Sequence, residues 1–434
     1  MGESIWTEAQ LPEYAPLRTS IAADVLVIGG GMAGLLCARL LQEAGVGCVV
    51  AERCRIAQGV TANTTAKLTA QHGLLYHKLL RQFGKEVAQG YLQANLSALD
   101  AFRAMSREIP CQFQELPAYL YSLEGAAPLQ RELRALEDIG YRPAWESRPP
   151  LPFPVDGAVK FPSQGQFHPL QFLQGILPGL TIYENTPVLS LEGTHAVTPH
   201  GRIRAQKVIV ATHFPFLNRH GAYFLKLFQE RSYVLALENA GDVGGMYIDA
   251  KSGGLSLRNA GSALLLGGGS HRTGKKSAGW EPLRAFARQY YPASRERAAW
   301  ATQDCITLDG IPYIGQYSPK LPDIYVATGF NKWGMTSSMV AAQLLKDAIL
   351  ARPNAYAGVF APQRPMLRKQ LLVNGWEASV NLLTPTRPRC PHLGCALKWN
   401  PQEHSWDCPC HGSRFAENGR LLNNPATGDL PPQE

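Results

Sequence analysis

The chain has 434 residues, of which 45% are hydrophobic and 18% charged, as is usual for a globular protein with one large and one small domain or two comparable ones. The formal net charge is +8, but the basic residues are scattered, with only short clusters such as His271–Lys276. We therefore expect no nucleic-acid-binding function, although a basic surface can attract an acidic partner or an anionic substrate.

The sequence also argues against export and against a membrane span. The first twenty residues contain no basic segment followed by an apolar core, so no secretory signal is predicted. The uncharged run Phe161–Tyr183 is long enough to cross a bilayer, but three prolines and four glutamines interrupt it. A cytoplasmic location is expected.

The N-terminal segment has the pattern of a strand, a glycine-rich turn and a helix. Val25–Ile28 is an apolar run suited to a strand buried on both faces, and Gly29, Gly31 and Gly34 follow as G-x-G-x-x-G. The first glycine permits the tight turn, the second permits close approach to a pyrophosphate, and the third permits close packing of the helix. The helix expected over Leu35–Glu43 would direct its N-terminal N–H groups at the phosphates.

A second strand completes this unit. Gly47–Ala51 is predicted to be a strand that ends at Glu52, which is 23 residues after Gly29 and is placed to accept hydrogen bonds from a ribose. A glycine-rich turn without a ligand is the alternative. The complete order of strand, turn, helix, strand and acidic residue predicts a dinucleotide site instead.

Later segments suggest which dinucleotide binds. "GVTANTTAKLTAQHG" (59–73) is predicted to be a polar loop leading into a helix, and "KVIVATHFP" (207–215) a buried strand with a polar end. "DGIPYIG" (309–315) and "IYVATGFNKWGMTSSMVAAQLL" (324–345) give another strand, loop and helix. Each segment alone could belong to a generic α/β core, but together their order resembles the D-amino-acid-oxidase (glycine-oxidase-like) family over residues 22–352. This resemblance implies FAD rather than NAD.

The resemblance also implies which residues contact FAD. In the family, the final helix directs its N-terminus at the flavin, and a strand comparable to residues 184–193 contacts the adenine. The expected FAD-contacting residues are Gly29, Gly31, Met32, Ala33, Gly34, Glu52, Arg53, Thr64, Thr65, Ala66, Val188, Ala211, Thr212, Gly329, Gly334, Met335 and Thr336.

Between the FAD-binding segments (about 22–77, 167–215 and 300–352) lies an interleaved substrate domain (about 78–166 and 216–299). Segments 231–239, 246–261 and 263–274 alternate as antiparallel strands do. Each candidate catalytic residue could also have an ordinary structural role, as a sheet-edge tyrosine, a surface ion-pair partner or a histidine in a turn. The candidates are Tyr233, Tyr247, Arg258, His271 and Lys332, with His271 considered as the base and Arg258 as the partner of a substrate carboxylate.

Two Cys/His pairs lie near the C-terminus. Cys390-x-His392 and Cys408-x-x-His411 are separated by fifteen residues, whereas the other cysteines outside this region are scattered. This is the spacing of a Rieske [2Fe–2S] centre, in which two thiolates hold one iron and two imidazoles the other. A structural Zn²⁺ is the alternative, but finger spacing would put cysteine with cysteine and histidine with histidine. We predict Cys390, His392, Cys408 and His411 as ligands.

The segments "CPHLGC" and "CPCHGS" resemble the cytochrome bc-type Rieske boxes. The resemblance implies a disulfide between Cys395 and Cys410, although cytosolic thiols are normally reduced. It also implies a hydrogen bond from Ser413 to a cluster sulfur, and a lowered potential because Phe415 stands where high-potential members have tyrosine. Because residues 353–386 are predicted to be only a proline-broken linker, most of the usual base layer is missing. We expect the lobe at 387–434 to pack on the FAD-binding domain.

The expected fold is therefore α/β: a Rossmann-like FAD-binding domain with an interleaved antiparallel-sheet substrate domain, followed by a small all-β Rieske lobe. The whole chain resembles bacterial FAD-dependent oxidoreductases with a fused C-terminal Rieske domain. This implies oxidation of a C–N bond in a small-molecule amine or amino acid, with electrons passing from FAD through the [2Fe–2S] cluster to an external redox protein or carrier, for which an acidic protein would suit the basic chain.

Two further readings follow from the family comparison. "LLLGGGSH" (264–271) lacks the O₂-activating lysine of sarcosine-oxidase-like members, and Thr302 stands where those members have the FAD-linking cysteine, with Cys305 out of register. We therefore expect a dehydrogenase with non-covalent FAD. The alternatives are electron entry through the cluster for reduction or monooxygenation, a redox-responsive binding module, and an O₂-using oxidase with a structural cluster. The substrate, the acceptor and the oligomeric state are not specified by the sequence.

Overall fold

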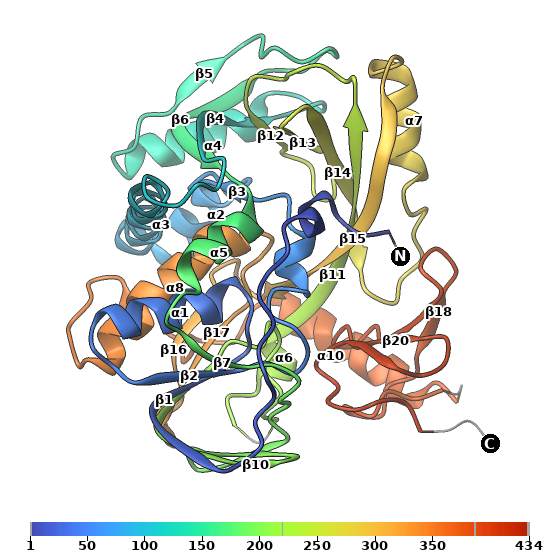
Figure 1. Ribbon diagram of the computed structural model, residues 1–434. Helices are drawn as coiled ribbons and strands as arrows, with labels where there is room; N and C mark the ends of the chain where they lie inside the picture. The colour runs from blue at the N-terminus through green and yellow to red at the C-terminus, as the bar shows by residue number, and fades with distance from the viewer. Residues whose placement is uncertain (1, 219, 386–387, 432–434) are drawn as a thin grey trace.

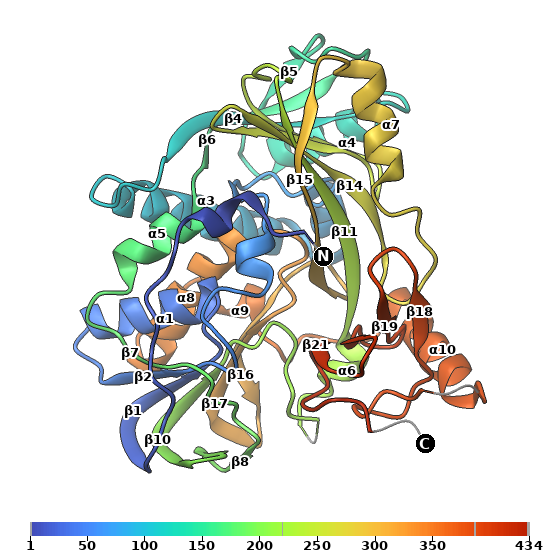
Figure 2. The same cartoon turned by 45° about the vertical axis from the view of Figure 1, so that its right-hand side comes forward.

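The structure is a computed structural model that describes residues 2–218, 220–385 and 388–431. In these residues two large sheets form the body of the molecule, one above the other in Figure 1, and a small third sheet lies beside them near the C-terminus. The turned view in Figure 2 shows the same three parts, with the long strands β11 and β14 descending from the upper sheet toward the small one.

The lower sheet has a parallel core in the order β10-β1-β2-β7, extended by β17 and the antiparallel β16. Residues Val25–Ile28 of β1 are all buried, as the apolar run predicted. The strands of the lower sheet are β1 (Ile21–Ile28), β2 (Cys48–Ala51), β7 (Thr181–Tyr183), β8 (Ser190–Glu192), β9 (His195–Thr198), β10 (Gly201–Val210), β16 (Tyr313–Ser318) and β17 (Leu321–Thr328).

Two helices that are far apart in the sequence pack on one another over the lower sheet. They are α1 (Met32–Glu43) and α8 (Gly334–Ile349), and α3 packs on α8 in turn. Helix α1 begins three residues before the predicted start, inside the glycine motif. A Cβ at Gly34 would lie 1.9 Å from the carbonyl oxygen of Gly29, so only glycine permits this approach of helix and turn.

The upper sheet is largely antiparallel, in the order β15-β11-β14-β13-β12-β4-β6-β3 with β5 paired to β6. The alternating segments predicted as strands are confirmed as β11, β12, β13 and β14. The strands are β3 (Lys67–Leu68), β4 (Gln114–Tyr121), β5 (Ala144–Glu146), β6 (Ala158–Gln166), β11 (Leu227–Glu238), β12 (Met246–Asp249), β13 (Ser256–Ala260), β14 (Ala263–Arg272) and β15 (Arg295–Thr307).

Helices surround both sheets. They include the 3-10 turns η1 (Ile5–Glu8) and η2 (Val60–Asn63), and the α-helices α2 (Tyr76–Phe83), α3 (Lys85–Met105), α4 (Ala127–Asp138), α5 (Pro169–Ile176), α6 (Tyr223–Lys226) and α7 (Glu281–Tyr290). The run Phe161–Tyr183 is divided among β6, α5 and β7, and no helix among the described residues is long and apolar enough to cross a membrane.

The third unit consists of β18 (Lys398–Asn400), β19 (Ser405–Asp407), β20 (Arg414–Ala416) and β21 (Leu421–Asn423), paired in sequence order. The preceding segment differs from the predicted linker, because it contains α9 (Ala357–Phe360) and α10 (Lys369–Leu383). The strand expected over 184–193 is also different: only Ser190–Glu192 is a strand, and the residues before it form a loop.

Candidate active site and cluster site

A cavity opens at the carboxyl ends of β1, β2, β10 and β17, and we call it the nucleotide cavity. Such crevices are where open α/β sheets bind ligands. It contains twelve of the predicted FAD-contacting residues: Gly29, Gly31, Met32, Ala33, Glu52, Arg53, Val188, Ala211, Thr212, Gly329, Gly334 and Met335.

The geometry of the glycine turn fits a dinucleotide. Gly29 adopts φ +111°, which glycine alone tolerates well, and a Cβ added to Gly31 would meet only the Thr61 hydroxyl at 3.4 Å, leaving its backbone open to the cavity. The Glu52 carboxylate accepts hydrogen bonds from the N–H of Gly30 at 2.7 Å and of Cys54 at 2.9 Å. Glu52 is therefore held at the cavity wall, beside the N-terminus of α1.

The remaining predicted residues lie elsewhere. Gly34 packs α1 against the turn, and Thr64 and Thr65 line the second cavity described below. Ala66 is buried and its carbonyl accepts a hydrogen bond from Arg258, while the hydroxyl of Thr336 is bonded to the backbone of Thr69. None of these five residues lines the nucleotide cavity.

One segment of the nucleotide cavity was not predicted. Residues 422–427, which follow β20 and belong to the C-terminal unit, line it. Asn424 donates from Nδ2 to the carbonyl oxygens of Thr212 and Phe214, the latter at 2.9 Å. No motif marks this segment, because its role depends on how two units far apart in the sequence dock.

A second cavity, which we call the substrate cavity, lies under β11 and β14 and shares a border with the first. Six residues line both: Val60, Asp304, Asn331, Lys332, Gly334 and Met335. Of the predicted catalytic residues, Tyr233 and Lys332 line the substrate cavity. Lys332 forms an ion pair with Glu230 at 2.8 Å and, like Asn331, has a positive φ, an unusual conformation of the kind that collects at functional sites.

The other three predicted catalytic residues line neither cavity. Arg258 is buried with its guanidinium over the ring of Trp6, at 5.3 Å from the centroid. Tyr247 donates to the carbonyl of Val243 and stacks on a neighbouring tyrosine. His271 stacks on Tyr233 outside the cavity wall. The expected roles of His271 as base and Arg258 as carboxylate partner are therefore not supported by their positions.

Two charged groups of the substrate cavity form no ion pair among the described residues, although the Lys332 ammonium lies close enough to Asp304 to lower its pKa. The Lys67 ammonium is buried and donates only to hydroxyls, at 2.6 Å to Ser256 and 3.3 Å to Thr65, and burial lowers its pKa to about 7. The carboxylate of Asp304 makes no hydrogen bond or ion pair within the described ranges, and burial raises its pKa to about 6. Neither residue was predicted, since nothing in the sequence distinguishes a buried lysine or aspartate from exposed ones.

The C-terminal unit brings together the four predicted cluster ligands. Cys390 and Cys408 are both buried, and the Cys408 side chain lies close enough to lower the pKa of the Cys390 thiol. The rings of His392 and His411 are 4.9 Å apart, and Nδ1 of each is buried without a partner. Burial lowers the histidine pKa values to about 4 and 3, so both rings are neutral, as metal ligation requires. Two thiols and two free imidazole nitrogens fit a [2Fe–2S] cluster.

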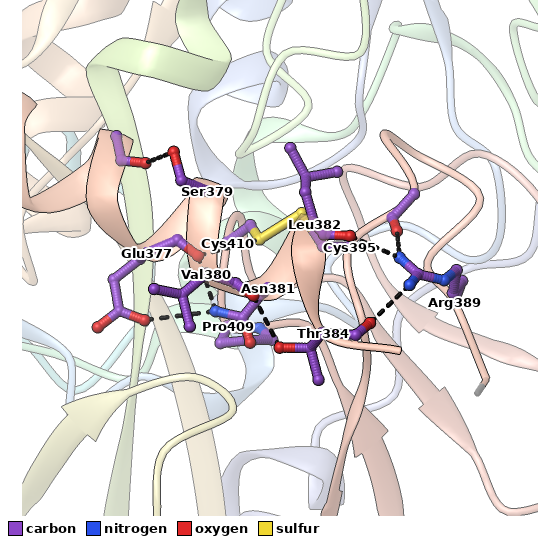
Figure 3. Close-up of a disulfide and its surroundings, with 12 residues drawn as sticks. Glu377, Ser379, Val380, Asn381, Leu382, Thr384, Arg389, Cys395, Pro409 and Cys410 are labelled. Atoms are coloured by element: carbon purple, nitrogen blue, oxygen red, sulfur yellow. Dashed lines mark hydrogen bonds between the residues drawn. A yellow bond between two sulfur atoms is a disulfide. The ribbon is translucent and has the colours of Figure 1, made fainter. Parts of the chain in front are cut away.

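The disulfide implied by the Rieske resemblance is present. Cys395 and Cys410 are bonded, and Figure 3 shows the bridge beside α10, where Cys410 Sγ lies 4.0 Å from the carbonyl oxygen of Glu377. Ser413 lies against the Cys390 thiol and also accepts a hydrogen bond from the Ala426 N–H at 3.0 Å. The cluster loops are thus tied both to α10 and to the segment that lines the nucleotide cavity.

The C-terminal unit meets the FAD-binding segment, as expected, through Asn424, but its buried ion pair with the larger domain is with the antiparallel sheet of the substrate domain. The guanidinium of Arg231 on β11 forms a bidentate ion pair with Glu403, which also accepts from Arg414 at 3.0 Å. Arg272 on β14 donates to the carbonyl oxygens of Pro409 and Cys410 at 2.8 and 3.0 Å. The strands that wall the substrate cavity therefore also hold the cluster loops.

Comparison with known proteins agrees with both sites. Residues 24–348 match the family model "FAD dependent oxidoreductase" (DAO). The chain belongs to this FAD-dependent oxidoreductase family. Residues 369–433 match the Rieske [2Fe-2S] domain, a match that includes α10. The chain is an FAD-dependent oxidoreductase that carries a C-terminal Rieske domain, and its cofactors are FAD and a [2Fe–2S] cluster.

Three relatives illustrate the match. A protein of Bacillus subtilis (strain 168) named as a Rieske 2Fe-2S iron-sulfur protein, YhfW, is 34% identical, with 99% of this chain and 97% of that one covered. The cytochrome b6-f complex iron-sulfur subunit of Synechococcus sp. (strain JA-3-3Ab) is 49% identical over 41 residues, 9% of this chain and 24% of that one. Glycine oxidase from Geobacillus kaustophilus shares the fold, with a TM-score of 0.67 at 19% identity over 79% of this chain and 99% of that one.

Proposed function

We propose that this oxidoreductase oxidises a C–N bond of an amine or amino acid in the substrate cavity and delivers the electrons through the Rieske domain to an external acceptor. The observation that carries the proposal is the position of the two cluster histidines. The ring of Phe214 lies against both of them, with centroids 6.3 Å from His392 and 6.2 Å from His411. Ala211, Thr212 and His213, directly before Phe214, line the nucleotide cavity.

Bound FAD accepts two electrons from an organic substrate, and a [2Fe–2S] cluster accepts one at a time. The residues around the histidines hold them toward the FAD-binding domain. The side-chain oxygen of Asn218 lies 2.9 Å from Nε2 of His392, and Gln229 donates from Nε2 to the backbone carbonyl of His411 at 2.8 Å. The histidine edge of the cluster site is therefore turned inward, which supports transfer within the molecule.

Asp304 is suited to receive the amine. An ammonium ion must lose a proton before its C–N bond is oxidised, because the nitrogen needs a free lone pair. Asp304 borders both cavities, so its carboxylate lies where the substrate would meet the flavin-facing wall. We assign to it binding of the substrate ammonium and acceptance of its proton. A carboxyl whose pKa lies near 6 is well matched to this exchange at neutral pH.

Lys67 is suited to bind a carboxylate. Its ammonium is held by two hydroxyls at the wall of the same cavity and is close enough to the Arg258 guanidinium for that charge to lower its pKa further, after burial. Lys67 and Arg258 form no ion pair within the part of the chain that the structure describes, and two such buried cations favour an anion. A substrate with both an amino and a carboxylate group would neutralise Asp304 and Lys67 together, which makes an amino acid the favoured substrate class.

The test is anaerobic reduction of the protein containing both cofactors by a panel of L- and D-amino acids, N-methyl amino acids and primary amines. Bleaching of the flavin band followed by the EPR signal of a reduced Rieske cluster is the expected result. The Cys408→Ser variant is the control, and we expect it to bleach with the same substrate but not to reduce cytochrome c. A panel in which no compound bleaches the flavin would contradict amine oxidation, and rapid O₂ consumption that Cys408→Ser leaves unchanged would contradict the external acceptor.

A further inference from the structure

Helix α10 is oriented with its two asparagine side chains toward the protein. Asn374 and Asn381 are 5% and 3% exposed. Asn374 Oδ1 accepts from Arg272 of the substrate domain at 2.9 Å, whereas Nδ2 of Asn381 donates within the helix, to the carbonyl of Glu377 at 2.7 Å. The backbone carbonyl of Asn381 accepts from the N–H of Ala396 in a cluster loop. The inner side of α10 is thus fixed to the substrate domain and the cluster loops by polar contacts.

The opposite side of α10 is apolar and exposed, the reverse of an ordinary surface helix. Trp376 is 70% exposed, Leu372 76% and Leu383 83%. We call this side the α10 apolar face; its residues are Leu372, Val373, Trp376, Val380, Leu382 and Leu383. Single exposed apolar residues are common, but a contiguous row of them along one helix marks an interaction surface.

Positive charge borders this face. Lys369 begins α10 and Lys276 lies in the neighbouring loop, and both are exposed. The only acidic residue of the helix, Glu377, is already paired with Lys275 at 2.7 Å and has a side chain only 16% exposed. The rim therefore presents cations and no uncompensated carboxylate from α10, which complements a negatively charged surface.

We propose that the α10 apolar face binds the surface of an anionic lipid membrane. An exposed row of leucine, valine and tryptophan side chains flanked by lysine is the pattern of a helix that lies in the plane of the lipid headgroups. Figure 2 shows α10 at the outer edge of the molecule, beyond the strands of the Rieske domain, so it can approach a flat surface. None of the described helices can cross a bilayer, so the attachment is peripheral.

This arrangement would place the cluster close to the membrane. Because α10 packs directly on the disulfide-linked loops (Figure 3), only the width of one helix, about 10 Å, separates these loops from whatever contacts the apolar face. The proposal concerns the surface alone and does not depend on which substrate the protein oxidises.

The experiment is flotation of the protein containing both cofactors with vesicles of phosphatidylcholine alone or mixed with phosphatidylglycerol. We expect flotation with the mixed vesicles, weakened by salt. The Leu372→Glu/Trp376→Glu variant should lose at least about tenfold in partition coefficient, since it inserts two carboxylates into the apolar face. Leu123→Glu/Trp145→Glu makes the same change at two partly exposed positions elsewhere and should float as the wild type does.

A second pair of variants tests the charge. Lys369→Gln/Lys276→Gln should lose about fivefold for each charge removed, whereas Lys85→Gln/Lys320→Gln, which lowers the net charge equally at other exposed sites, should not. The visible spectra of flavin and cluster show that each variant is folded. Absence of wild-type flotation, flotation unchanged in the Leu372/Trp376 variant, or a dimer in solution that this variant dissociates would each overturn the proposal.

Discussion

The side chain of Gln229 donates a hydrogen bond from Nε2 to the backbone carbonyl of His411, at 2.8 Å, and another to that of Asn424 at 2.9 Å. Gln229 is on β11, four residues before Tyr233, which lines the substrate cavity. Four residues of strand span only about 13 Å. One strand thus positions both a wall of the substrate cavity and a loop of the cluster, so the distance between them is fixed by the sheet.

The contact at Gln229 predicts an effect of Gly412→Ala. Gly412 has φ +87°, and a Cβ there would lie 2.5 Å from Cβ of Gln229. The substitution should displace the cluster loop, at a cost of about 1–3 kcal/mol for the backbone conformation alone. We expect cluster reduction after flavin reduction to slow about tenfold or more, with flavin bleaching by the substrate unchanged. Rapid-mixing absorbance measures both.

Gly428→Ala is the matched control, because Gly428 lacks a positive φ and has no atom within 4 Å of the added Cβ. Unaltered cluster reduction in Gly412→Ala would show that the contact between β11 and the cluster loop does not set the transfer rate.

The sequence predicted most of what local chemistry determines. The turn at Gly29 and the predicted ligands Cys390 and His392 belong to short motifs whose geometry is built within a few residues, so the sequence could propose them directly. By contrast, Lys67 and Asp304 become distinctive only in the folded protein, where Lys67 is buried, Asp304 is half-buried, and neither forms an ion pair among the described residues. The family resemblance drew attention to Arg258 and His271, which the structure places outside the substrate cavity.

Helix α10 shows a second limit. Prolines at both ends of segment 353–386 suggested a linker, and the helix between them has apolar residues on its outer side, so its periodicity gave no indication of which side faces the protein. That orientation is set by contacts with Arg272, which is distant in the sequence, and with Ala396 in a cluster loop. How one unit docks on another cannot be predicted from the sequence pattern of either unit.

Glu403 should be essential for holding the Rieske domain in place. Its side chain is fully buried between Arg231 and Arg414, so Glu403→Gln leaves the buried Arg231 guanidinium without its ion-pair partner and Arg414 with Asp407 alone. We expect a loss of about 3–5 kcal/mol in the free energy of unfolding, measured by urea titration at the cluster absorbance. Glu124→Gln, at an exposed pair with Lys251, should change it by less than about 1 kcal/mol.

The interaction of Glu403 with Arg231 and Arg414 also predicts that the free energy of unfolding is sensitive to acid. Burial acts to raise the pKa of Glu403, but the two arginines outweigh it and the pKa is lowered from 4.5. A lowered folded pKa means that this stabilisation is complete above pH 4.5 and is lost as the pH falls further. If the wild type and Glu403→Gln lost the same amount of unfolding free energy as the pH falls below 4.5, this prediction would be contradicted.

Lys67 predicts a carboxylate preference that can be measured without knowing the substrate. Benzoate should bind more tightly than benzamide when binding is followed by the change in the flavin spectrum. Lys67→Met should weaken benzoate binding about tenfold to a hundredfold and leave the affinity for benzamide unchanged. Since the pKa of Lys67 is lowered to about 7, benzoate affinity should decline as the pH rises through 7. Lys251→Met, at a cavity lysine paired with Glu124, should bind as the wild type does. Equal affinities for the two probes would argue against a carboxylate site at Lys67.

Asp304 should control how the rate of flavin reduction falls at acidic pH. With a pKa raised to about 6, mainly by burial, its carboxylate can accept the proton of the substrate ammonium only above that pH, so the rate of flavin reduction should rise as the pH increases through about 6. Asp304→Asn should lower this rate by about 10²–10⁴ and remove the acid limb. The control is Asp249→Asn, which changes a carboxylate of the same cavity that accepts from the Lys251 N–H at 3.0 Å. If Asp304→Asn kept the acid limb while only its rate fell, the carboxylate would position the amine without accepting its proton, and the base would have to be sought in the substrate or in solvent.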